Sequence, residues 1–104
     1  MNNQIFDMNN KNTIITGAAG KLGKSISFTL AELGSNLILV DRFKEDLSRL
    51  KLEIDRKYNV DVKTFEVDLE NEYDRKKFVE NLQEEIKSLN CLINNAAFVG
   101  TSNL

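Results

Sequence analysis

The sequence predicts an α/β domain built on a parallel sheet, because short strand-like runs alternate with amphipathic helical segments along the chain. Runs rich in branched aliphatic residues occupy residues 12–16, 36–40, 60–67 and 91–94. Three segments with apolar residues at helical spacing lie between them. A crossover helix returns the chain in its original direction, so the strands are expected to run parallel.

The first half of the chain contains two predicted strands and one helix. The runs NTIIT (Asn12–Thr16) and NLILV (Asn36–Val40) lack polar alternation, which is typical of strands buried on both faces. The helix between them is predicted to begin near Lys21 and to end before Gly34, a glycine in the position of a C-cap. Its apolar stripe consists of Leu22, Ile26, Leu30 and Leu33.

The second half repeats the alternation. Strands are predicted at Val60–Val67 (VDVKTFEV) and Cys91–Asn94 (CLIN). Asp41 and Asn71 are of the residue types that start helices, and we expect them to begin the second and third helix. The apolar stripes of these helices are Leu47, Leu50 and Ile54 in one, and Phe78, Leu82, Ile86 and Leu89 in the other.

Right-handed crossovers constrain how these strands are ordered. If the second and third strands build outward on one side of the first, the fourth returns to its other side, which gives the order 3-2-1-4. The strand order reverses between the first and fourth strands. In open α/β sheets, ligands bind in the crevice beyond the carboxyl ends of the strands at such a point.

Composition limits the class of protein. A chain of 104 residues with a formal charge of −2 suits one small domain, and without a charge block it predicts neither nucleic acid nor a membrane as partner. The start of the chain lacks the features of a signal peptide, so we expect a cytoplasmic protein. The single cysteine, Cys91, excludes an internal disulfide, and the lack of histidine argues against a metal site or a Ser/His/Asp triad.

The stretch TIITGAAGKLGKSI places Gly17, Gly20 and Gly23 between the first strand and the first helix. A helix that starts near Lys21 directs free N–H groups and the positive end of its dipole at the crevice, which favours a phosphate. We expect Gly17 to permit a tight turn, Gly20 a close approach of backbone to the anion, and Gly23 close packing of helix on strand. Asp41, about 20 residues further on, can accept hydrogen bonds from an adenosine ribose.

With these motifs the sequence resembles the short-chain dehydrogenase/reductase family. Thr16 and the three glycines match the family's cofactor loop, and Asp41 lies where the family selects its cofactor. VDL (Val67–Leu69) resembles the segment that contacts adenine, and CLINNAA (Cys91–Ala97) is similar to the family's NNAG strand. The residues thereby assigned to cofactor binding are Thr16, Gly17, Gly20, Lys21, Leu22, Gly23, Asp41, Arg42, Asp68, Leu69, Asn95, Ala96 and Ala97.

The resemblance implies an NAD(P)-dependent oxidoreductase that moves a hydride between nicotinamide and a carbonyl or alcohol substrate, and a homo-oligomer is a possible assembly. It covers nearly the whole chain but only the first half or less of such an enzyme. Residues 1–104 are accordingly interpreted as one incomplete NAD(P)-binding Rossmann domain, with a partial doubly wound sheet and a polar lead-in at residues 1–10. The family's catalytic Ser, Tyr and Lys follow the fourth strand, so no catalytic residue is expected in this chain.

Two features of the resemblance concern individual side chains. A carboxylate at Asp41 repels a 2′-phosphate, so NAD(H) is the expected cofactor, although the neighbouring Arg42 can bind the 2′-phosphate of NADP(H) if Asp41 turns away. Tyr73 and Lys77 have the YxxxK spacing of the family's catalytic pair. They precede NNAA instead of following it, and we therefore interpret them as a solvated helix start.

Other interpretations remain open from the sequence. The spacing TGxxGxxG is typical of extended family members that act on nucleotide sugars, and Ala97 replaces the last glycine of NNAG. A non-catalytic dinucleotide-binding module would show the same motifs. A P-loop nucleoside triphosphatase is suggested by GKS (Gly23–Ser25), but five residues separate Gly17 from Gly23 where the P-loop has four. Asp41 and Asp68 can also be helix caps.

Overall fold

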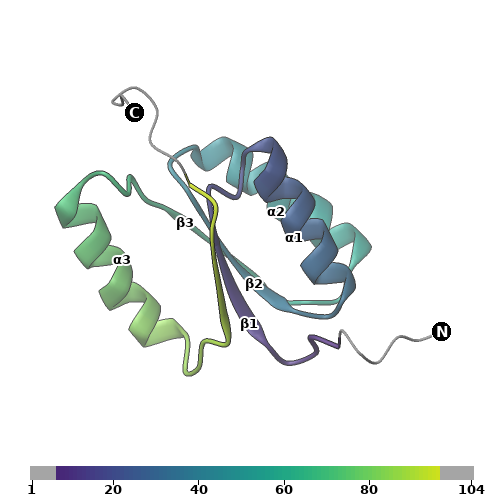
Figure 1. The fold of residues 1–104 in the computed structure, drawn as a ribbon. Coiled ribbons are helices and arrows are strands. Elements are labelled where there is room, and N and C mark those ends of the chain that lie inside the picture. Colours follow the sequence, from purple (N-terminus) through teal and green to yellow (C-terminus); the bar gives the residue numbers. More distant parts are fainter. Residues whose placement is uncertain (1–6, 97–104) are drawn as a thin grey trace.

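The strands of the computed structural model, which describes residues 7–96, form one parallel sheet in the order β3-β2-β1-β4 (Figure 1). Strands and helices alternate without exception in this part of the chain, so the predicted fold class and strand order are confirmed. The elements are β1 (Asn12–Thr16), α1 (Lys21–Glu32), β2 (Asn36–Asp41), α2 (Lys44–Lys57), β3 (Val62–Glu66), α3 (Glu72–Glu85) and β4 (Cys91–Asn94).

The register of the sheet brings the ends of three strands together. Thr16 at the end of β1 pairs with Val40 of β2 on one side and with Asn94 of β4 on the other. Helices α1 and α2 cover one face of the sheet, and α3 covers the other (Figure 1). The loops that follow β1, β2, β3 and β4 therefore leave from the same edge of the sheet, which is the edge predicted to bind a ligand.

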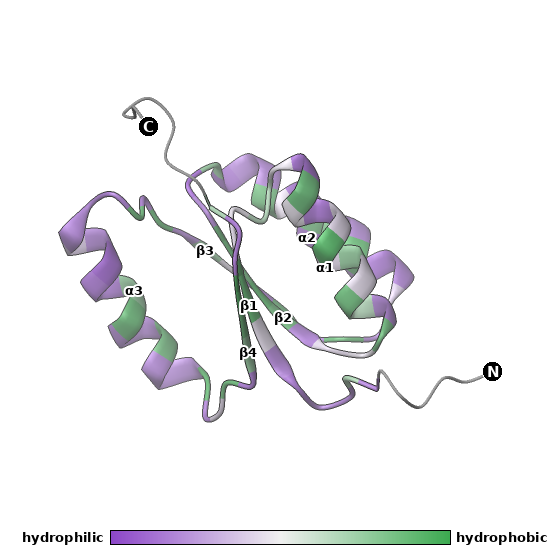
Figure 2. Ribbon diagram, in the orientation of Figure 1, coloured by the Kyte–Doolittle hydropathy of each residue, from purple (hydrophilic) through white to green (hydrophobic). Residues whose placement is uncertain are grey.

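The two central strands are buried on both faces, as their apolar runs predict. On the side of α1 and α2, Ile15 and Leu39 pack with residues of the helices, including Leu50. On the side of α3, Ile14 and Val40 form a second cluster. Figure 2 shows hydrophobic residues along the strands and on the helix faces that point toward them. Successive residues of a strand belong to different clusters because their side chains point to opposite faces of the sheet.

Helix α1 contacts the sheet mainly through small residues, and Ile26 and Leu30 of its predicted apolar stripe pack beside them against the core. Its buried positions are Gly23, Ser27 and Ala31, while Leu22 is 62% exposed. Small side chains allow the helix axis to lie close to the strands, and the larger residues then flank the contact. The predicted C-cap is confirmed: Gly34 has a φ of +100°, its N–H donates to Ala31, and the next N–H donates to Leu30.

Several element boundaries differ from the prediction. Asp41 continues β2 by pairing with Glu66, so α2 starts later, with Phe43 as its N-cap. Strand β3 covers Val62–Glu66 and not Val60–Val67. Helix α3 ends at Glu85, so the predicted apolar positions Ile86 and Leu89 follow the helix. Asn71 caps α3 as predicted, accepting the N–H of Asp74 at 2.9 Å, and Asp68 does not cap it.

The face under α3 is only partly covered. Helix α3 contains no buried residue, and Phe78 provides its aromatic contact with the sheet, an edge-to-face pair with Phe65 at 5.2 Å between ring centroids. Leu92 of β4 pairs with Ile14 of β1 and therefore shares the α3 side, yet it is 59% exposed. The uncovered part of this face lies at the β4 edge, as expected from one helix over four strands.

Candidate functional site

A cleft of about 790 Å³ lies beyond the carboxyl ends of the strands. Its position matches the predicted site at the reversal of strand order between β1 and β4. Loops after all four strands contribute to its walls. The lining residues are Gly17, Ala19, Gly20, Lys21, Leu22, Asp41, Arg42, Phe43, Asp46, Val67, Asp68, Leu69, Glu70, Asn95 and Ala96.

The three glycines of the first loop have different reasons to be glycine. Gly17 has a φ of +66°, and a Cβ there would lie 3.0 Å from Cα of Ala96. A Cβ at Gly23 would overlap the carbonyl oxygen of Gly17 and lie 2.8 Å from Cα of Ala18, so α1 packs directly on the loop. A Cβ at Gly20 would have room, because its nearest neighbour would be the Gly17 carbonyl oxygen at 3.6 Å. Packing within the protein therefore does not require a glycine at this cleft-lining position.

The N-terminus of α1 opens toward the cleft without a capping side chain. Its N-cap is Gly20, and its first turn contains no acidic residue. The first turns of α2 and α3 each contain two acidic residues, and α3 is capped by Asn71. The first N–H groups of a helix have no partner within the helix. At α1 they remain available, together with the positive end of the helix dipole, for an anion in the cleft.

Thr16 connects the ends of β1 and β4 from behind the cleft. Its hydroxyl oxygen accepts the N–H groups of Asn95 at 2.9 Å and Ala96 at 3.1 Å, and the hydroxyl donates to the side-chain oxygen of Asn94 at 3.0 Å. The amide of Asn95 donates in turn to the carbonyl oxygen of Gly17 at 3.2 Å. The segment after β4 is thus held against the glycine loop, and Thr16 positions the cleft wall without lining it.

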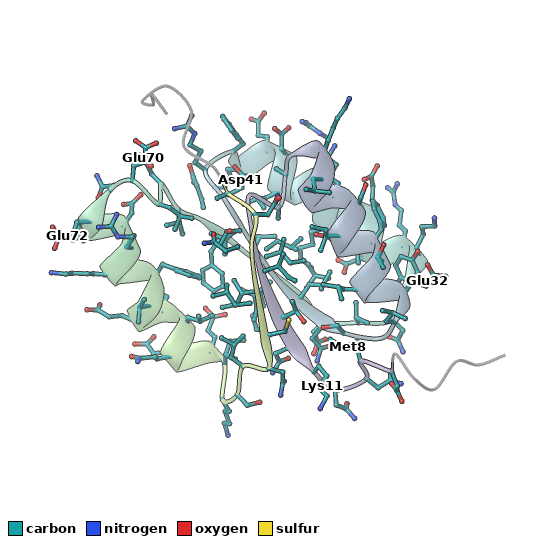
Figure 3. All side chains as sticks on the ribbon, in the orientation of Figure 1. Met8, Lys11, Glu32, Asp41, Glu70 and Glu72 are labelled. Carbon is teal, nitrogen blue, oxygen red and sulfur yellow. The ribbon has the colours of Figure 1, made fainter. Side chains whose placement is uncertain are left out.

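Asp41 is the last residue of β2 and lies at the cleft. Met8 and Lys11 lie at the opposite end of the strands (Figure 3). The carboxylate oxygens of Asp41 accept backbone N–H groups on two sides. Oδ2 accepts from Ala19 in the glycine loop at 2.9 Å. Oδ1 accepts from Arg42 at 2.7 Å and from Phe43 at 3.3 Å. The predicted ribose acceptor is therefore also a link between the glycine loop and the start of α2.

The outer wall of the cleft combines an aromatic ring with charged side chains. Phe43 is 53% exposed, and the Arg42 guanidinium carbon lies 5.2 Å from its ring centroid, a cation–π contact. Asp68 forms a turn before α3 by accepting the N–H of Glu70 at 3.0 Å. The acidic lining residues are Asp41, Asp46, Asp68 and Glu70, against the basic Lys21 and Arg42. The charge of these lining residues is therefore net negative.

The structure brings most of the predicted site residues together. Those that line the cleft are Gly17, Gly20, Lys21, Leu22, Asp41, Arg42, Asp68, Leu69, Asn95 and Ala96. Thr16 and Gly23 lie behind the lining, and Ala97 lies outside the described residues. The prediction missed the lining residues Ala19, Phe43, Asp46, Val67 and Glu70. Ala19, Phe43, Val67 and Glu70 are adjacent to predicted residues in the sequence, whereas Asp46 lies within α2 and has no predicted neighbour.

Other candidate chemistry lies away from the cleft. Tyr73 is 70% exposed at the start of α3, and neither it nor Lys77 lines the cleft. The GKS sequence (Gly23–Ser25) lies inside α1, which begins at Lys21. In a P-loop, the corresponding residues would lie at the junction between the loop and the helix. Within residues 7–96, no three His, Cys, Asp or Glu side chains group as metal ligands. No helix in that part of the chain has the length and apolar character needed to span a membrane.

Comparison with known proteins identifies the family. A family model described as short chain dehydrogenase matches residues 11–104. The chain is 33% identical over 88 residues to 17-beta-hydroxysteroid dehydrogenase type 3 of Rattus norvegicus, covering 83% of this chain and 28% of the relative. It is 43% identical over 56 residues to very-long-chain 3-oxoacyl-CoA reductase of Vanderwaltozyma polyspora, covering 54% and 16%.

Solved structures agree with these sequence relatives. NAD+-bound xylitol dehydrogenase matches with a TM-score of 0.81 and 26% identity, over 88% of this chain and 35% of that chain. L-sorbose reductase from Gluconobacter frateurii, complexed with NADPH and L-sorbose, matches with a TM-score of 0.83 and 25% identity, over 89% and 35%. The chain spans about a third or less of the length of these relatives. With the family model matching most of its length, the chain belongs to the short-chain dehydrogenase family.

Proposed function

We propose that the cleft binds a nicotinamide dinucleotide, with the pyrophosphate at the N-terminus of α1 and the adenosine ribose at Asp41. The observation that carries this proposal is the uncapped start of α1 beside a loop in which Gly20 faces the cleft without a packing reason to be glycine. Free N–H groups and a glycine backbone suit close contact with an anion. The similar proteins of known structure include one with NAD+ and one with NADPH.

We further propose that NAD(H) is preferred over NADP(H). Four acidic side chains line the cleft against two basic ones, so a 2′-phosphate, which adds negative charge, would meet a net repulsive environment. Asp41 carries a carboxylate where the ribose hydroxyls would lie, and carboxylates accept hydrogen bonds from hydroxyl groups. Arg42 is the side chain that would favour a 2′-phosphate, and its guanidinium lies over the ring of Phe43.

The chain would contribute cofactor binding to a complete oxidoreductase that acts on a carbonyl or alcohol group. A nicotinamide cofactor supplies or accepts the hydride in such chemistry. The residues of this chain would bind the pyrophosphate, orient the ribose and hold the cleft wall through Thr16. None of the described lining residues is Ser, Tyr or His, so the cleft offers no hydroxyl or imidazole side chain as proton donor. This favours a binding role for residues 7–96, with proton transfer depending on residues outside that range.

Calorimetric titration of the purified chain with NAD+, NADP+ and ATP tests the proposal. We expect binding of both dinucleotides, tighter for NAD+, and no hydrolysis of ATP. A turnover assay should use a steroid ketone and a 3-oxoacyl-CoA, because relatives are named for these substrates. Failure of the folded chain to bind either dinucleotide would contradict the proposed function. Binding without turnover would agree with a dinucleotide-binding part.

A further inference from the structure

Asp41 has a second task beyond the ribose contact. We propose that Asp41 is a positioning residue that holds the glycine loop in its cofactor-binding conformation before any cofactor arrives. The inference rests on the proposed function for the location of the dinucleotide, but its evidence is a set of hydrogen bonds within the protein. Oδ2 of Asp41 accepts the N–H of Ala19, which lies between Gly17 and Gly20 in the loop.

The loop is attached to the end of β2 by two consecutive N–H groups. Ala18 donates to the backbone carbonyl of Val40 at 3.1 Å, and Ala19 donates to the side chain of Asp41 at 2.9 Å. The first bond is independent of side-chain identity. The second depends on a carboxylate at position 41. Within the loop, Gly20 donates to the carbonyl oxygen of Gly17 at 3.2 Å. Asp41 therefore provides the side-chain attachment to β2 for the part of the loop that leads into Gly20 and the start of α1.

The other oxygen of Asp41 fixes the direction of the carboxylate. Oδ1 accepts N–H groups from Arg42 and Phe43, at the turn before α2. With Oδ1 held there, Oδ2 points at the loop. A carboxylate has about four lone-pair sites, and three N–H donors leave acceptor capacity for a ribose hydroxyl. Loop positioning and ribose binding are therefore compatible in one side chain.

The substitution Asp41→Asn distinguishes the loop-positioning role of this side chain from the effect of its negative charge. Asparagine has one acceptor oxygen, so it cannot serve both the turn before α2 and the Ala19 N–H. The loop then loses its second attachment, and the N–H groups that face the pyrophosphate are less well oriented. Removal of a negative charge would by itself favour an anionic ligand. Weaker binding of the pyrophosphate part in Asp41→Asn would therefore come from geometry and not from charge.

The test compares NAD+ with an analogue whose adenosine ribose lacks the 2′- and 3′-hydroxyl groups. This analogue removes the ribose contact from every measurement. We expect Asp41→Asn to weaken its binding about two- to tenfold, the effect of one ordinary hydrogen bond. The matched control is Asp55→Asn, an acid-to-amide change on α2 at a residue paired with Lys51 outside the cleft. Equal affinity of the analogue for wild type and Asp41→Asn would overturn the inference.

Amide hydrogen exchange in the ligand-free protein provides a readout that needs no cofactor. We expect the Ala19 N–H to be protected in wild type and Asp55→Asn, and to exchange at least about tenfold faster in Asp41→Asn, while Ala18 stays protected. An unprotected Ala19 in the wild type would overturn the inference even if no variant folds. A protected Ala19 in a protein that binds neither NAD+ nor NADP+ would instead contradict the proposed function and leave the loop-positioning role supported.

Discussion

At the scale of single residues, the site depends on positions where side-chain chemistry and backbone geometry coincide. Gly17 combines a positive φ with a close approach to Ala96, so it is constrained twice. Gly20 is free of both constraints, which makes it the better position for separating ligand binding from folding. Asp41 joins the loop to α2 and is also the proposed ribose acceptor. These differences decide which substitutions are informative.

Gly20→Val should prevent dinucleotide binding while the protein keeps its fold. Its Cβ would meet no protein atom closer than 3.6 Å, but the branched side chain would occupy the space proposed for the pyrophosphate. Calorimetry should show at least about a tenfold loss of NAD+ affinity, with an unchanged helical circular dichroism spectrum. Gly17→Val should also abolish binding, but the contact with Ala96 adds a folding cost. Undiminished affinity in folded Gly20→Val would mean that the backbone there does not contact the ligand.

Asp41→Ala should shift cofactor preference toward NADP(H). The substitution removes the repulsion of a 2′-phosphate and the acceptor for the ribose hydroxyls, and it leaves Arg42 available for the phosphate. We expect the ratio of the NADP+ to NAD+ dissociation constants to fall by about tenfold, the equivalent of one charged hydrogen bond. Parallel titrations with both cofactors measure it. An unchanged ratio, or tighter NADP+ binding in the wild type, would remove Asp41 from its role in selection.

At the scale of elements, cap chemistry explains why α1 differs from α3. Asn71 satisfies the N–H of Asp74, and acidic residues occupy the first turn of α3, so that helix start is stabilised within the protein. Helix α1 has neither feature at its start, although Gly34 ends it in a well-formed Schellman motif. The protein therefore stabilises one end of α1 and leaves the cleft end open, which is the arrangement an anion-binding helix requires.

Asn71→Ala should destabilise the protein by about 1 kcal/mol, the usual effect of losing an N-cap. Urea unfolding followed by circular dichroism measures the change in the free energy of unfolding. The control is Glu80→Ala, on the exposed surface of the same helix, for which we expect a change within about 0.5 kcal/mol. Equal effects of the two substitutions would show that the Asn71 side chain does not contribute as a cap.

Element boundaries show how far sequence patterns can be used. The runs at β1 and β2 lack polar alternation, which is typical of strands buried on both faces, and their prediction is confirmed. Asp41 was ambiguous because the same residue type suits a helix cap and a strand end. In the structure Asp41 pairs with Glu66 of β3, so it belongs to the strand. This pairing joins parts of the chain that are distant in sequence. Close packing of α1 through Gly23 was predicted from the glycine motif, but Ser27 and Ala31 were missed because hydropathy alone ranks Leu22 above them.

The cleft-lining residues were likewise predictable only where local sequence determines their position. The three glycines of the loop were predictable because their spacing between a strand and a helix is typical of a dinucleotide-binding turn. Phe43 and Ala19 were not, since their contact with the cleft depends on how Asp41 orients the turn before α2 and the glycine loop. Asp46 reaches the cleft only because α2 starts at Lys44, a boundary that was predicted too early. Side-chain hydrogen bonds between separate loops leave no periodic signal in a sequence.

At the scale of the whole molecule, the two faces of the sheet are covered unequally by helices. Helices α1 and α2 cover one face of the sheet with fully buried residues, whereas α3 alone contacts the other face and buries none of its own residues fully. Parallel sheets are stable when both faces are covered. Leu92 and Val79 are exposed on β4 and α3, and β4 is the last strand of the described sheet on its side. This asymmetry predicts how the 104 residues behave in isolation.

The isolated chain should be marginally stable or self-associate. An open edge strand with an exposed leucine offers both backbone groups and apolar surface to a second molecule. Light scattering after size exclusion should show species larger than a monomer, and Leu92→Lys should reduce them because a charge disfavours edge pairing. Leu52→Lys is the control, since Leu52 is similarly exposed but lies on α2. A cooperatively melting monomer at high concentration would contradict this expectation.

Hydride transfer by the isolated 104 residues should be absent, despite the YxxxK spacing of Tyr73 and Lys77. A proton donor must come within hydrogen-bond reach of the reacting group, and Tyr73 is exposed at the start of α3, outside the cleft lining. Its neighbourhood is that of a solvated helix, with Lys76 and Glu72 forming an ion pair at 3.2 Å. NADH oxidation should be assayed with a panel of carbonyl substrates, for wild type and Tyr73→Phe. Turnover in the wild type that Tyr73→Phe abolishes would show that a catalytic site forms within these residues, with Tyr73 as its proton donor.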